Sequence, residues 1–249
     1  MIERDALEGI RAILLDIEGT TTPIVFVFDV LFPYARRHLR RHLEQHGTSP
    51  EYDALFDRLR TDHASDRSAG EAVPAWVDAP PAARLASVAS YSEWLMDRDR
   101  KSTALKVLQG KIWEEGYARG ELVGDVFADV PGALERWRAQ RLHIGIFSSG
   151  SALAQQLLFR HSSAGDLTRF LQWYFDTTTG PKTDSESYHR IATEIGLAPG
   201  AILFVSDVTG ELDAARRAGM RTTLSIRPGN KPPPPEHGHP VVQTFDALR

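Results

Sequence analysis

Four short strand-like segments in this chain, three of them mainly apolar, each end at a polar or turn-forming residue, and this pattern constrains the fold more than any other feature. The segments are residues 11–16, 142–147, 201–205 and 221–226. The second and third are followed by segments with helical spacing, and strands that alternate with helices of about 10–15 residues are typical of a parallel sheet. The sequence therefore predicts an α/β protein, with a parallel sheet and helices on both faces. A last short strand is expected at residues 241–242, after a proline-rich loop.

A long block between the first two of these segments contains no convincing strand. Helical periodicity appears there in residues 31–43, 52–59, 84–95 and 102–117. An all-helical block inserted between two strands of one sheet predicts a second, smaller domain. The expected division is residues 1–27 and 127–249 for the α/β core and residues 28–126 for the helical insertion.

Composition excludes several classes of chemistry. The 249 residues include no cysteine, which rules out disulfides, a thiolate nucleophile and cysteine-ligated zinc or iron–sulfur sites. A net charge of −4 argues against a dedicated nucleic-acid binder. No apolar run approaches the roughly 20 residues of a membrane span, and the N-terminal stretch holds no segment suited to a signal peptide. We therefore expect a cytoplasmic monomer with no nucleic-acid or membrane partner.

Two acids follow the first predicted strand. Asp16 and Glu18 lie two residues apart, and Gly19 allows the backbone a sharp exit. One carboxylate could act as a nucleophile and the other as a general acid–base, since both can turn toward one cavity. The alternative is a turn with a helix-capping acid. Asp207, at the end of a later strand, could join Asp16 in holding Mg²⁺, which prefers one or two carboxylates with water and phosphate oxygens.

Hydroxyl groups and a lysine complete the candidate site. Ser148 and Ser149 follow the second strand and open a helix, where hydroxyls and backbone N–H groups can bind an anion. An ordinary helix cap is the alternative. Lys182 lies in a polar loop and is a candidate only because the other site residues are present. Glu211 forms a second acid pair with Asp207. Because ligands bind at the carboxyl ends of strands in open parallel sheets, we expect these residues at one rim.

Taken in order, these residues resemble the motifs of the haloacid dehalogenase superfamily of phosphotransferases. An acid-x-acid-Gly-Thr pattern begins at Asp16, a serine follows the second strand, a distant lysine comes next, and a Ser-Asp pair closes the series. The helical insertion matches the cap of that superfamily. The resemblance implies a Rossmann-like core with an inserted helical cap.

Glu18 narrows the resemblance. Most phosphatases of the superfamily have aspartate at this position, whereas LLDIEGTTTPI, together with FSSGS and the GPK loop, resembles the enolase-phosphatases of methionine salvage along nearly the whole chain. Those enzymes use Mg²⁺ to convert 2,3-diketo-5-methylthiopentyl 1-phosphate, through its enol phosphate, to the dihydroxy-keto-methylthiopentene and phosphate. The resemblance, and not the spacing, supplies this substrate.

The resemblance also implies a role for each matching residue. Asp16 would be the nucleophile and a metal ligand, Glu18 the proton donor and a metal-site residue, and Asp207 a further metal ligand. The residues that hold the phosphate would be Ser148, Ser149 and Lys182. Glu211 matches the trailing acid of the last motif and is a candidate for supporting the ligands. Glu18 is also our hypothesis for the enolisation base, because its side chain is one methylene longer than that of aspartate.

Two other functions remain open. A phosphatase of the same superfamily could act on a sugar phosphate or another small phosphate ester, which a substrate panel would reveal. A phospho-accepting receiver module also places Asp, Ser or Thr, and Lys on a parallel sheet. Receivers are about half as long, however, and carry the phosphorylated aspartate on the third strand, whereas Asp16 follows the first.

Histidines occur in two further clusters. His38, His42 and His46 recur at i,i+4 spacing within a basic helical run, which we interpret as a solvated face rather than a metal site. His237 and His239 lie in the proline-rich loop, and we expect both to be exposed.

Overall fold

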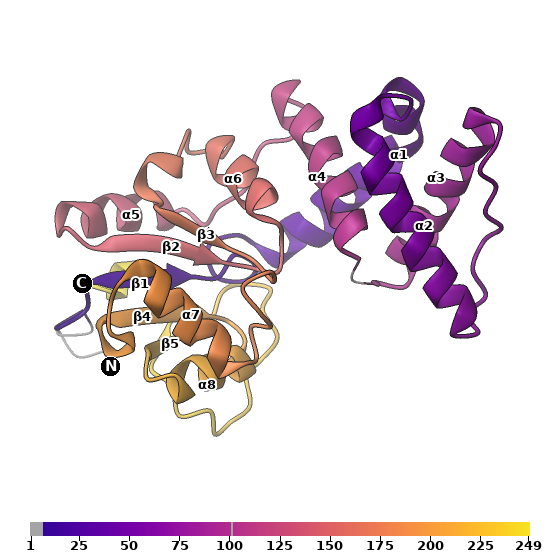
Figure 1. The fold of residues 1–249 in the computed structure, drawn as a ribbon. Helices are drawn as coiled ribbons and strands as arrows, with labels where there is room; N and C mark the ends of the chain where they lie inside the picture. Colours follow the sequence, from indigo (N-terminus) through magenta and orange to yellow (C-terminus); the bar gives the residue numbers. More distant parts are fainter. Residues whose placement is uncertain (1–6, 101) are drawn as a thin grey trace. The chain divides into compact units, whose positions relative to one another are not determined.

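The computed structural model describes residues 7–100 and 102–249, so residues 1–6 of the N-terminal stretch considered above lie outside the described residues. The chain forms two compact units. One consists of Met1–Phe28 and Val123–Arg249, and the other of Asp29–Leu122. The first unit holds the strands, and the second, drawn in purple and magenta in Figure 1, is helical.

A six-stranded sheet forms the centre of the first unit. Its strands are β1 (Ala12–Leu15), β2 (His143–Phe147), β3 (Trp173–Phe175), β4 (Ile202–Ser206), β5 (Arg221–Ser225) and β6 (Val241–Val242). They lie in the order β3-β2-β1-β4-β5-β6, and every neighbouring pair is parallel (Figure 1). The predicted parallel α/β fold is confirmed.

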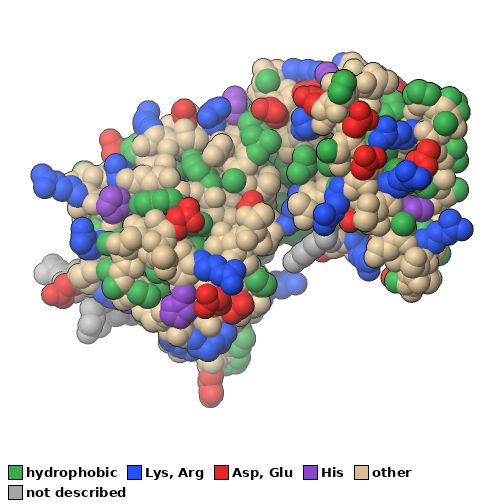
Figure 2. All heavy atoms as spheres, viewed as in Figure 1, with side chains coloured by type: hydrophobic (Ala, Val, Ile, Leu, Met, Phe, Trp, Pro, Cys, Tyr) green, Lys and Arg blue, Asp and Glu red, His purple; other side chains and the backbone are tan. Residues whose placement is uncertain are grey.

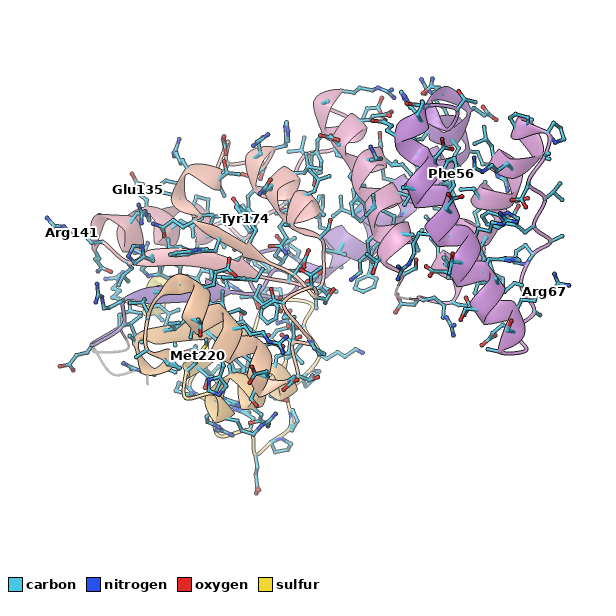
Figure 3. All side chains as sticks on the ribbon, viewed as in Figure 1. Phe56, Arg67, Glu135, Arg141, Tyr174 and Met220 are labelled. Atoms are coloured by element: carbon cyan, nitrogen blue, oxygen red, sulfur yellow. The ribbon has the colours of Figure 1, made fainter. Side chains whose placement is uncertain are left out.

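Helices pack on both faces of this sheet because its central strands are apolar on both sides. The helices are α5 (Val130–Ala139), α6 (Ala152–Arg160), α7 (Ser185–Ile195) and α8 (Thr209–Arg217). Leu14 of β1 packs in one layer with residues of α7 and α8, and Met220, labelled in Figure 3, belongs to the same layer. Ile13 points the opposite way, since side chains alternate along a strand, and α5 contacts β2 outside that layer.

The strand β3 does not emerge from the sequence pattern, because three residues are too few to reveal a period. It pairs with β2 at the edge of the sheet. The loop after β3 carries Lys182, and α7 follows it with Asp184 as N-cap, whose side chain accepts a hydrogen bond from Glu186 N. The edge strand thereby brings this loop to the same rim as the ends of the central strands.

The second unit is a bundle of helices. These are α1 (Phe32–His46), α2 (Asp53–Ser68), α3 (Pro81–Asp97) and α4 (Thr103–Ala118). All predicted helical segments form, and Phe56 points into the bundle (Figure 3). Helix α2 continues well beyond its predicted end at residue 59. The sequence does not indicate this second half, because only His63 is buried there and the apolar periodicity is lost.

Charged side chains of both signs alternate on the face that Figure 2 shows. Several form exposed ion pairs, among them Arg40 with Glu93 at 2.7 Å and Arg60 with Asp78 at 2.8 Å. Pairs of this kind each contribute about 0–1 kcal/mol to stability. Within residues 7–100 and 102–249, no helix is both long and apolar enough to cross a membrane.

The expectation that His239 is exposed is wrong. Its side chain is 0% exposed, with Nδ1 2.8 Å from Thr222 Oγ1 and Nε2 3.2 Å from Asp213 Oδ1. His237 is half-buried and its ring stacks on that of His239. The pairing of β6 with β5 draws the end of the proline-rich loop onto the sheet, which no local pattern indicates.

A buried ion pair joins three distant segments of the first unit. Arg227 Nη1 lies 3.0 and 2.9 Å from the carboxylate oxygens of Asp129, and the Arg227 side chain is 2% exposed. Arg227 also donates to the carbonyl oxygens of Thr20 at 3.2 Å and Gln243 at 2.9 Å. The loop after β1, the start of α5 and the C-terminal segment are thus held together.

Replacing Asp129 with alanine is expected to lower the free energy of unfolding by about 3–5 kcal/mol, because Arg227 would stay buried without its partner. Denaturant unfolding measures this loss. The control is Asp246→Ala, which removes the exposed partner of Arg136 and should cost about 0–1 kcal/mol. Equal losses in the two variants would contradict the structural role of the buried pair.

Candidate active site

Asp16, Ser148 and Asp207 each follow a strand, and the three strands are neighbours. Strands β2, β1 and β4 lie side by side, and the last residue of β1 is in register with Ile146 and Val205. The backbone N–H of Asp16 donates to the carbonyl oxygen of Val205 at 3.0 Å. The sheet therefore brings residues that are far apart in the chain to one rim.

The carboxylate of Asp16 is almost completely buried, with 2% of the residue exposed. Its Oδ1 accepts hydrogen bonds from Ile17 N at 2.8 Å and from Lys182 Nζ at 2.5 Å, and its Oδ2 lies 3.2 Å from Ser206 Oγ. Burial of a carboxylate is costly unless it is paired and hydrogen-bonded. These contacts compensate the burial of Asp16 and fix its orientation.

Lys182 lies between two acids. Its Nζ is 2.5 Å from Asp16 Oδ1 and 2.7 Å from Glu211 Oε2, and its side chain is 8% exposed. Burial by itself lowers the pKa of the ammonium, but the charges and hydrogen bonds of Asp16 and Glu211 outweigh burial and raise the pKa. Tyr188 Oη donates to the carbonyl oxygen of Lys182 at 2.7 Å, so α7 holds the loop. Lys182 is therefore a fixed cation at the rim.

Glu18 faces the end of β2. Ser148 Oγ donates to Glu18 Oε2 at 3.4 Å and accepts from Gly150 N at 3.1 Å. Burial, followed by the neighbouring charge of Asp16, raises the pKa of Glu18. Its carboxyl group therefore holds a proton at higher pH than an ordinary glutamate does, which suits a general acid.

The serine-rich segment after β2 leads directly into α6. Ser151 is the N-cap of this helix, and its side chain accepts a hydrogen bond from Ala154 N at 3.3 Å. The capping role is thus filled by Ser151 rather than by Ser148 or Ser149, of which the first is buried and the second half-buried.

The turn after Glu18 brings the backbone close to Asp207. Gly19 has a φ of +69°, and a Cβ there would lie 2.5 Å from Asp207 Oδ2 and 2.7 Å from Asn230 Oδ1. Only glycine fits such an approach without strain. Asn230 Nδ2 donates to the carbonyl oxygen of Gly19 at 2.9 Å, whereas Oδ1 is a buried atom without a hydrogen bond to any described group.

Asp207 and Glu211 add negative charge to the same rim. Burial, and then the charges of Asp16 and Glu211, raise the pKa of Asp207 to about 7. Burial and the charge of Asp16 likewise raise the pKa of Glu211 to about 7. Several carboxyl groups thus crowd around the ammonium of Lys182, and an added cation or a bound proton would reduce their mutual repulsion.

Comparison with known proteins shows the family of this chain. Residues 10–219 match the family model of the haloacid dehalogenase-like hydrolases. Enolase-phosphatase E1 of Synechococcus elongatus is 53% identical over 222 residues, which cover 89% of this chain and 91% of that protein. This chain belongs to the enolase-phosphatase E1 family of haloacid dehalogenase-like hydrolases. The resemblance found in the sequence is confirmed.

Two further proteins are similar over nearly all of the chain. A probable bifunctional methylthioribulose-1-phosphate dehydratase/enolase-phosphatase E1 of Vitis vinifera is 46% identical over 242 residues, which cover 96% of this chain and 47% of that longer protein. The solved structure of UTR4 protein from Saccharomyces cerevisiae is 31% identical, with a TM-score of 0.76, covering 95% of this chain and 99% of that one. As a haloacid dehalogenase-like hydrolase the chain is an enzyme, and we do not retain the receiver alternative.

In this enolase-phosphatase E1 family member, the structure adds side chains that sequence reasoning missed. Ser206 Oγ lies 2.9 Å from Glu211 Oε2 and accepts from Val208 N at 3.1 Å, so it connects Glu211 to Asp16. The Ser-Asp pair at the end of β4 is visible in the sequence, but the motif suggests a role only for its acid. Asn230 gives no signal in the sequence, because it comes from the loop after β5.

The oxygen groups at the rim of this hydrolase fit a magnesium ion. Among the described residues, the carboxylates of Asp16, Glu18 and Asp207 do not meet as a ready three-ligand cluster, since Glu18 faces Ser148 instead. Mg²⁺ needs only one or two carboxylates, because it keeps several waters and also binds phosphate oxygens. Asp16 and Asp207 satisfy this requirement, and the unpartnered Oδ1 of Asn230 beside Asp207 is a further oxygen.

Asp207 is expected to make the metal-free protein less stable as the pH rises. Its pKa is about 7 when folded against an ordinary value of 3.8, so between these values the folded state binds more protons than the unfolded state, and its contribution to stability falls with rising pH. Thermal unfolding with a chelator present, compared with Asp207→Asn, measures this contribution.

Relative to Asp207→Asn, the wild type should therefore lose stability as the pH rises from about 4 to about 7, and the difference should then level off. The exposed Asp125 offers a control, and Asp125→Asn should keep the wild-type pH dependence. If the stability difference between the wild type and Asp207→Asn stayed constant across that interval, the raised pKa of Asp207 would be contradicted.

Proposed function

We propose that this chain is a Mg²⁺-dependent enolase-phosphatase that acts on 2,3-diketo-5-methylthiopentyl 1-phosphate in methionine salvage. The reaction passes through the enol phosphate and yields the dihydroxy-keto-methylthiopentene and inorganic phosphate. One observation carries the proposal: the buried carboxylate of Asp16 is paired with the Lys182 ammonium, and a second acid, Glu18, lies two residues further along. Phosphoryl transfer to a carboxylate needs a desolvated nucleophile, a fixed cation and a proton donor.

The names of the relatives support the substrate. The Vitis vinifera relative is named for a methylthioribulose-1-phosphate dehydratase joined to an enolase-phosphatase. Loss of water from methylthioribulose 1-phosphate leaves a 2,3-diketone that keeps its 1-phosphate, and this is the compound we propose. A protein that joins the two activities would use the product of the first reaction in the second, and we extend that substrate to this chain.

Charge repulsion is the first obstacle, because the nucleophile and the phosphate are both anions. Two unit charges about 4 Å apart repel by roughly 4 kcal/mol at an effective dielectric of 20, and about 1.4 kcal/mol corresponds to a factor of ten in rate. Lys182, which touches Asp16, offsets this repulsion. Ser148 and Ser149 would hold the phosphate in line with Asp16 through hydroxyl and backbone N–H donors.

Asp16 Oδ2 is the oxygen that we assign to the attack, because Oδ1 already accepts two hydrogen bonds. A bond forms between Oδ2 and phosphorus while the bond from phosphorus to the ester oxygen breaks. Glu18 donates its proton to the departing oxygen. Water then attacks the phosphorus, Glu18 takes a proton from that water, and the Asp16 carboxylate is released together with inorganic phosphate.

Asp16 and Asp207 would hold the Mg²⁺ ion, with Glu18 at the same rim and Asn230 Oδ1 as a further oxygen. When bound, the ion would neutralise charge on the phosphate oxygens. Asp207 must be ionised to bind it, and the pKa of Asp207 is raised to about 7. Metal binding is therefore expected to release a proton below that pH.

Glu18 is also our candidate for the enolisation base. This step removes a proton from the carbon that carries the phosphate ester. The electron pair of the broken C–H bond forms the new C=C bond, and the adjacent carbonyl oxygen becomes an enolate oxygen, which takes a proton from water to give the enol. The raised pKa makes the Glu18 carboxylate a stronger base than an ordinary one. Having taken this proton, Glu18 carries the acid form that the phosphoryl-transfer step needs, so one residue would serve both reactions.

The first experiment follows enol absorbance and released phosphate together. With Mg²⁺, the wild type should show a transient enol and then phosphate, and a chelator should abolish both signals. Asp16→Asn should still form the enol, while its rate of phosphate release falls by roughly 10⁴-fold or more. Phosphate without enol would indicate a phosphatase for another small phosphate ester. If neither signal appeared, the proposed substrate would be wrong, and a panel of phosphate esters would follow.

Glu18→Gln is expected to slow both steps, each by about 10²–10⁴-fold, because the amide can neither take nor give the proton. The same two-signal assay separates the steps. Glu135→Gln changes an exposed glutamate on α5 (Figure 3) and should leave both rates unchanged. Enol formation at the wild-type rate, together with lost phosphate release, would reject Glu18 as the enolisation base.

A further inference from the structure

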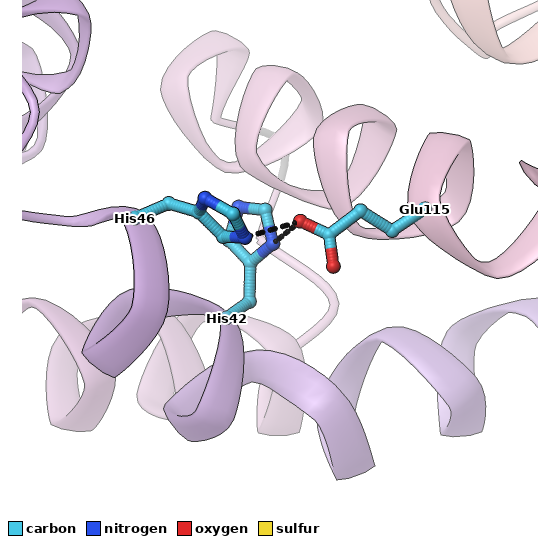
Figure 4. A group of neighbouring side chains, drawn as sticks. All are labelled: His42, His46 and Glu115. Atoms are coloured by element: carbon cyan, nitrogen blue, oxygen red, sulfur yellow. Dashed lines mark ion pairs between the residues drawn. The ribbon is translucent and has the colours of Figure 1, made fainter.

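The basic run of α1 contains histidines that the proposed reaction does not use. We interpreted this run as a solvated face, and for His42 that interpretation is wrong, because its side chain is 3% exposed. Leu39 and Leu43 are buried on the same side of the helix, where residues three and four apart are neighbours. Helix α4 brings Glu115 to this side, opposite His42 and His46 (Figure 4).

Three ligand-type atoms converge at this point. Glu115 Oε1 lies 2.8 Å from His42 Nδ1 and 2.9 Å from His46 Nε2, and all three atoms lie within 4.8 Å of one another. In the part of the chain that the structure describes, no other group of histidine and acidic side chains is drawn together in this way. His42 Nδ1 is close enough for an ion pair, yet it is a buried atom without a properly directed hydrogen bond.

Two of the three residues also make a contact on the side that faces away from this point. His42 Nε2 lies 2.7 Å from Tyr52 Oη, and Arg119 Nη2 donates to Glu115 Oε2 at 3.0 Å. Burial raises the pKa of Tyr52 to about 12, so its hydroxyl stays protonated. Histidines that bind metals almost always use their other ring nitrogen in such an outer contact, which fixes the ring and its tautomer.

We propose that His42, His46 and Glu115 form a binding site for a divalent transition-metal ion, with Zn²⁺ as the ion that the ligands favour. Two imidazole nitrogens and one carboxylate oxygen are ligands typical of Zn²⁺, whereas Mg²⁺ prefers oxygen ligands alone. Three protein ligands leave one position of a tetrahedral ion for water. The site lies within the helical unit and joins α1 to α4, and it does not depend on the proposed function.

A small opening of the cluster would admit the ion. Bonds of about 2.0–2.1 Å to a tetrahedral zinc ion place neighbouring ligand atoms about 3.3 Å apart, so the present separations of 2.8 and 2.9 Å would grow by roughly half an ångström. His46 is 43% exposed and Glu115 26% exposed, which leaves both free to adjust. A histidine binds a metal ion through its neutral imidazole, and burial lowers the pKa of His42 despite the opposing charge of Glu115.

Several positively charged side chains lie near the cluster. Arg119 touches Glu115, Arg41 lines the same shallow pocket, and Lys111 lies over the Tyr52 ring. These cations do not attract a metal ion, so binding would come from the ligands themselves. Without metal, the contacts of Glu115 with the two imidazoles would by themselves link α1 to α4.

The test uses the 249-residue protein in excess Mg²⁺, which should occupy the carboxylate rim and leave the histidine cluster for softer ions. Zn²⁺ is titrated calorimetrically, and Co²⁺ is added separately as a spectroscopic probe. Four-coordinate Co²⁺ with nitrogen ligands absorbs visible light strongly, whereas Co²⁺ among carboxylates and water does not. The wild type should bind one Zn²⁺ per chain and show the strong Co²⁺ bands.

His46→Gln and Glu115→Gln should weaken Zn²⁺ binding by more than the roughly 10–100-fold expected for losing an outer partner, and Tyr52→Phe by about 10–100-fold. His189→Gln, which changes an exposed histidine on α7, is the matched control and should bind as the wild type does. Because His46 is partly exposed, its replacement should leave the fold intact.

Two results would overturn the proposal. In the first, the wild type binds no Zn²⁺ in excess Mg²⁺, which would leave the cluster as a metal-free contact between α1 and α4. In the second, Zn²⁺ binding survives in His46→Gln but is lost in Asp207→Asn, which would place the ion at the carboxylate rim.

Discussion

The contact between Asp16 and Lys182 is the interaction on which the rest of the first unit depends. Both charges are almost fully buried, and removing one partner of such a pair costs about 3–5 kcal/mol. The pair must be assembled from a strand end and a loop 166 residues further along. The sheet order makes this possible, because β1 lies at the centre and the edge strand β3 delivers the Lys182 loop to the same rim.

The same rim concentrates more negative charge than Lys182 can balance. Asp207 and Glu211 respond by holding protons up to a pH of about 7, and Gly19 lets the backbone pass close to Asp207. An arrangement with unbalanced carboxylates lowers the stability of the metal-free protein near neutral pH. It also explains why a divalent cation and a phosphate group would be bound there together, since each offsets the charge of the other.

Much of this could be predicted from the sequence, because the signals are local. Asp16, Ser148 and Asp207 each end an apolar run, and parallel strands align their carboxyl ends. The strand β3 was missed because it is too short to show a period. His42 and His239 were expected to be solvated, because their neighbours in sequence are charged or prolines. Each is buried by a segment distant in the chain, α4 for His42 and the β5–β6 pairing for His239.

By itself the sequence determined the alternation of strands and helices, the helical insertion and the residue types at the strand ends, since each is carried by neighbours in the chain. Only the tertiary structure decided that Lys182 bridges Asp16 and Glu211, that Asn230 lies beside Asp207, and that two histidines converge on Glu115. The raised pKa values of Glu18, Asp207 and Glu211 were decided there as well. The reason is physical: burial and charge act through space, and the groups that set them come from elements far apart in sequence.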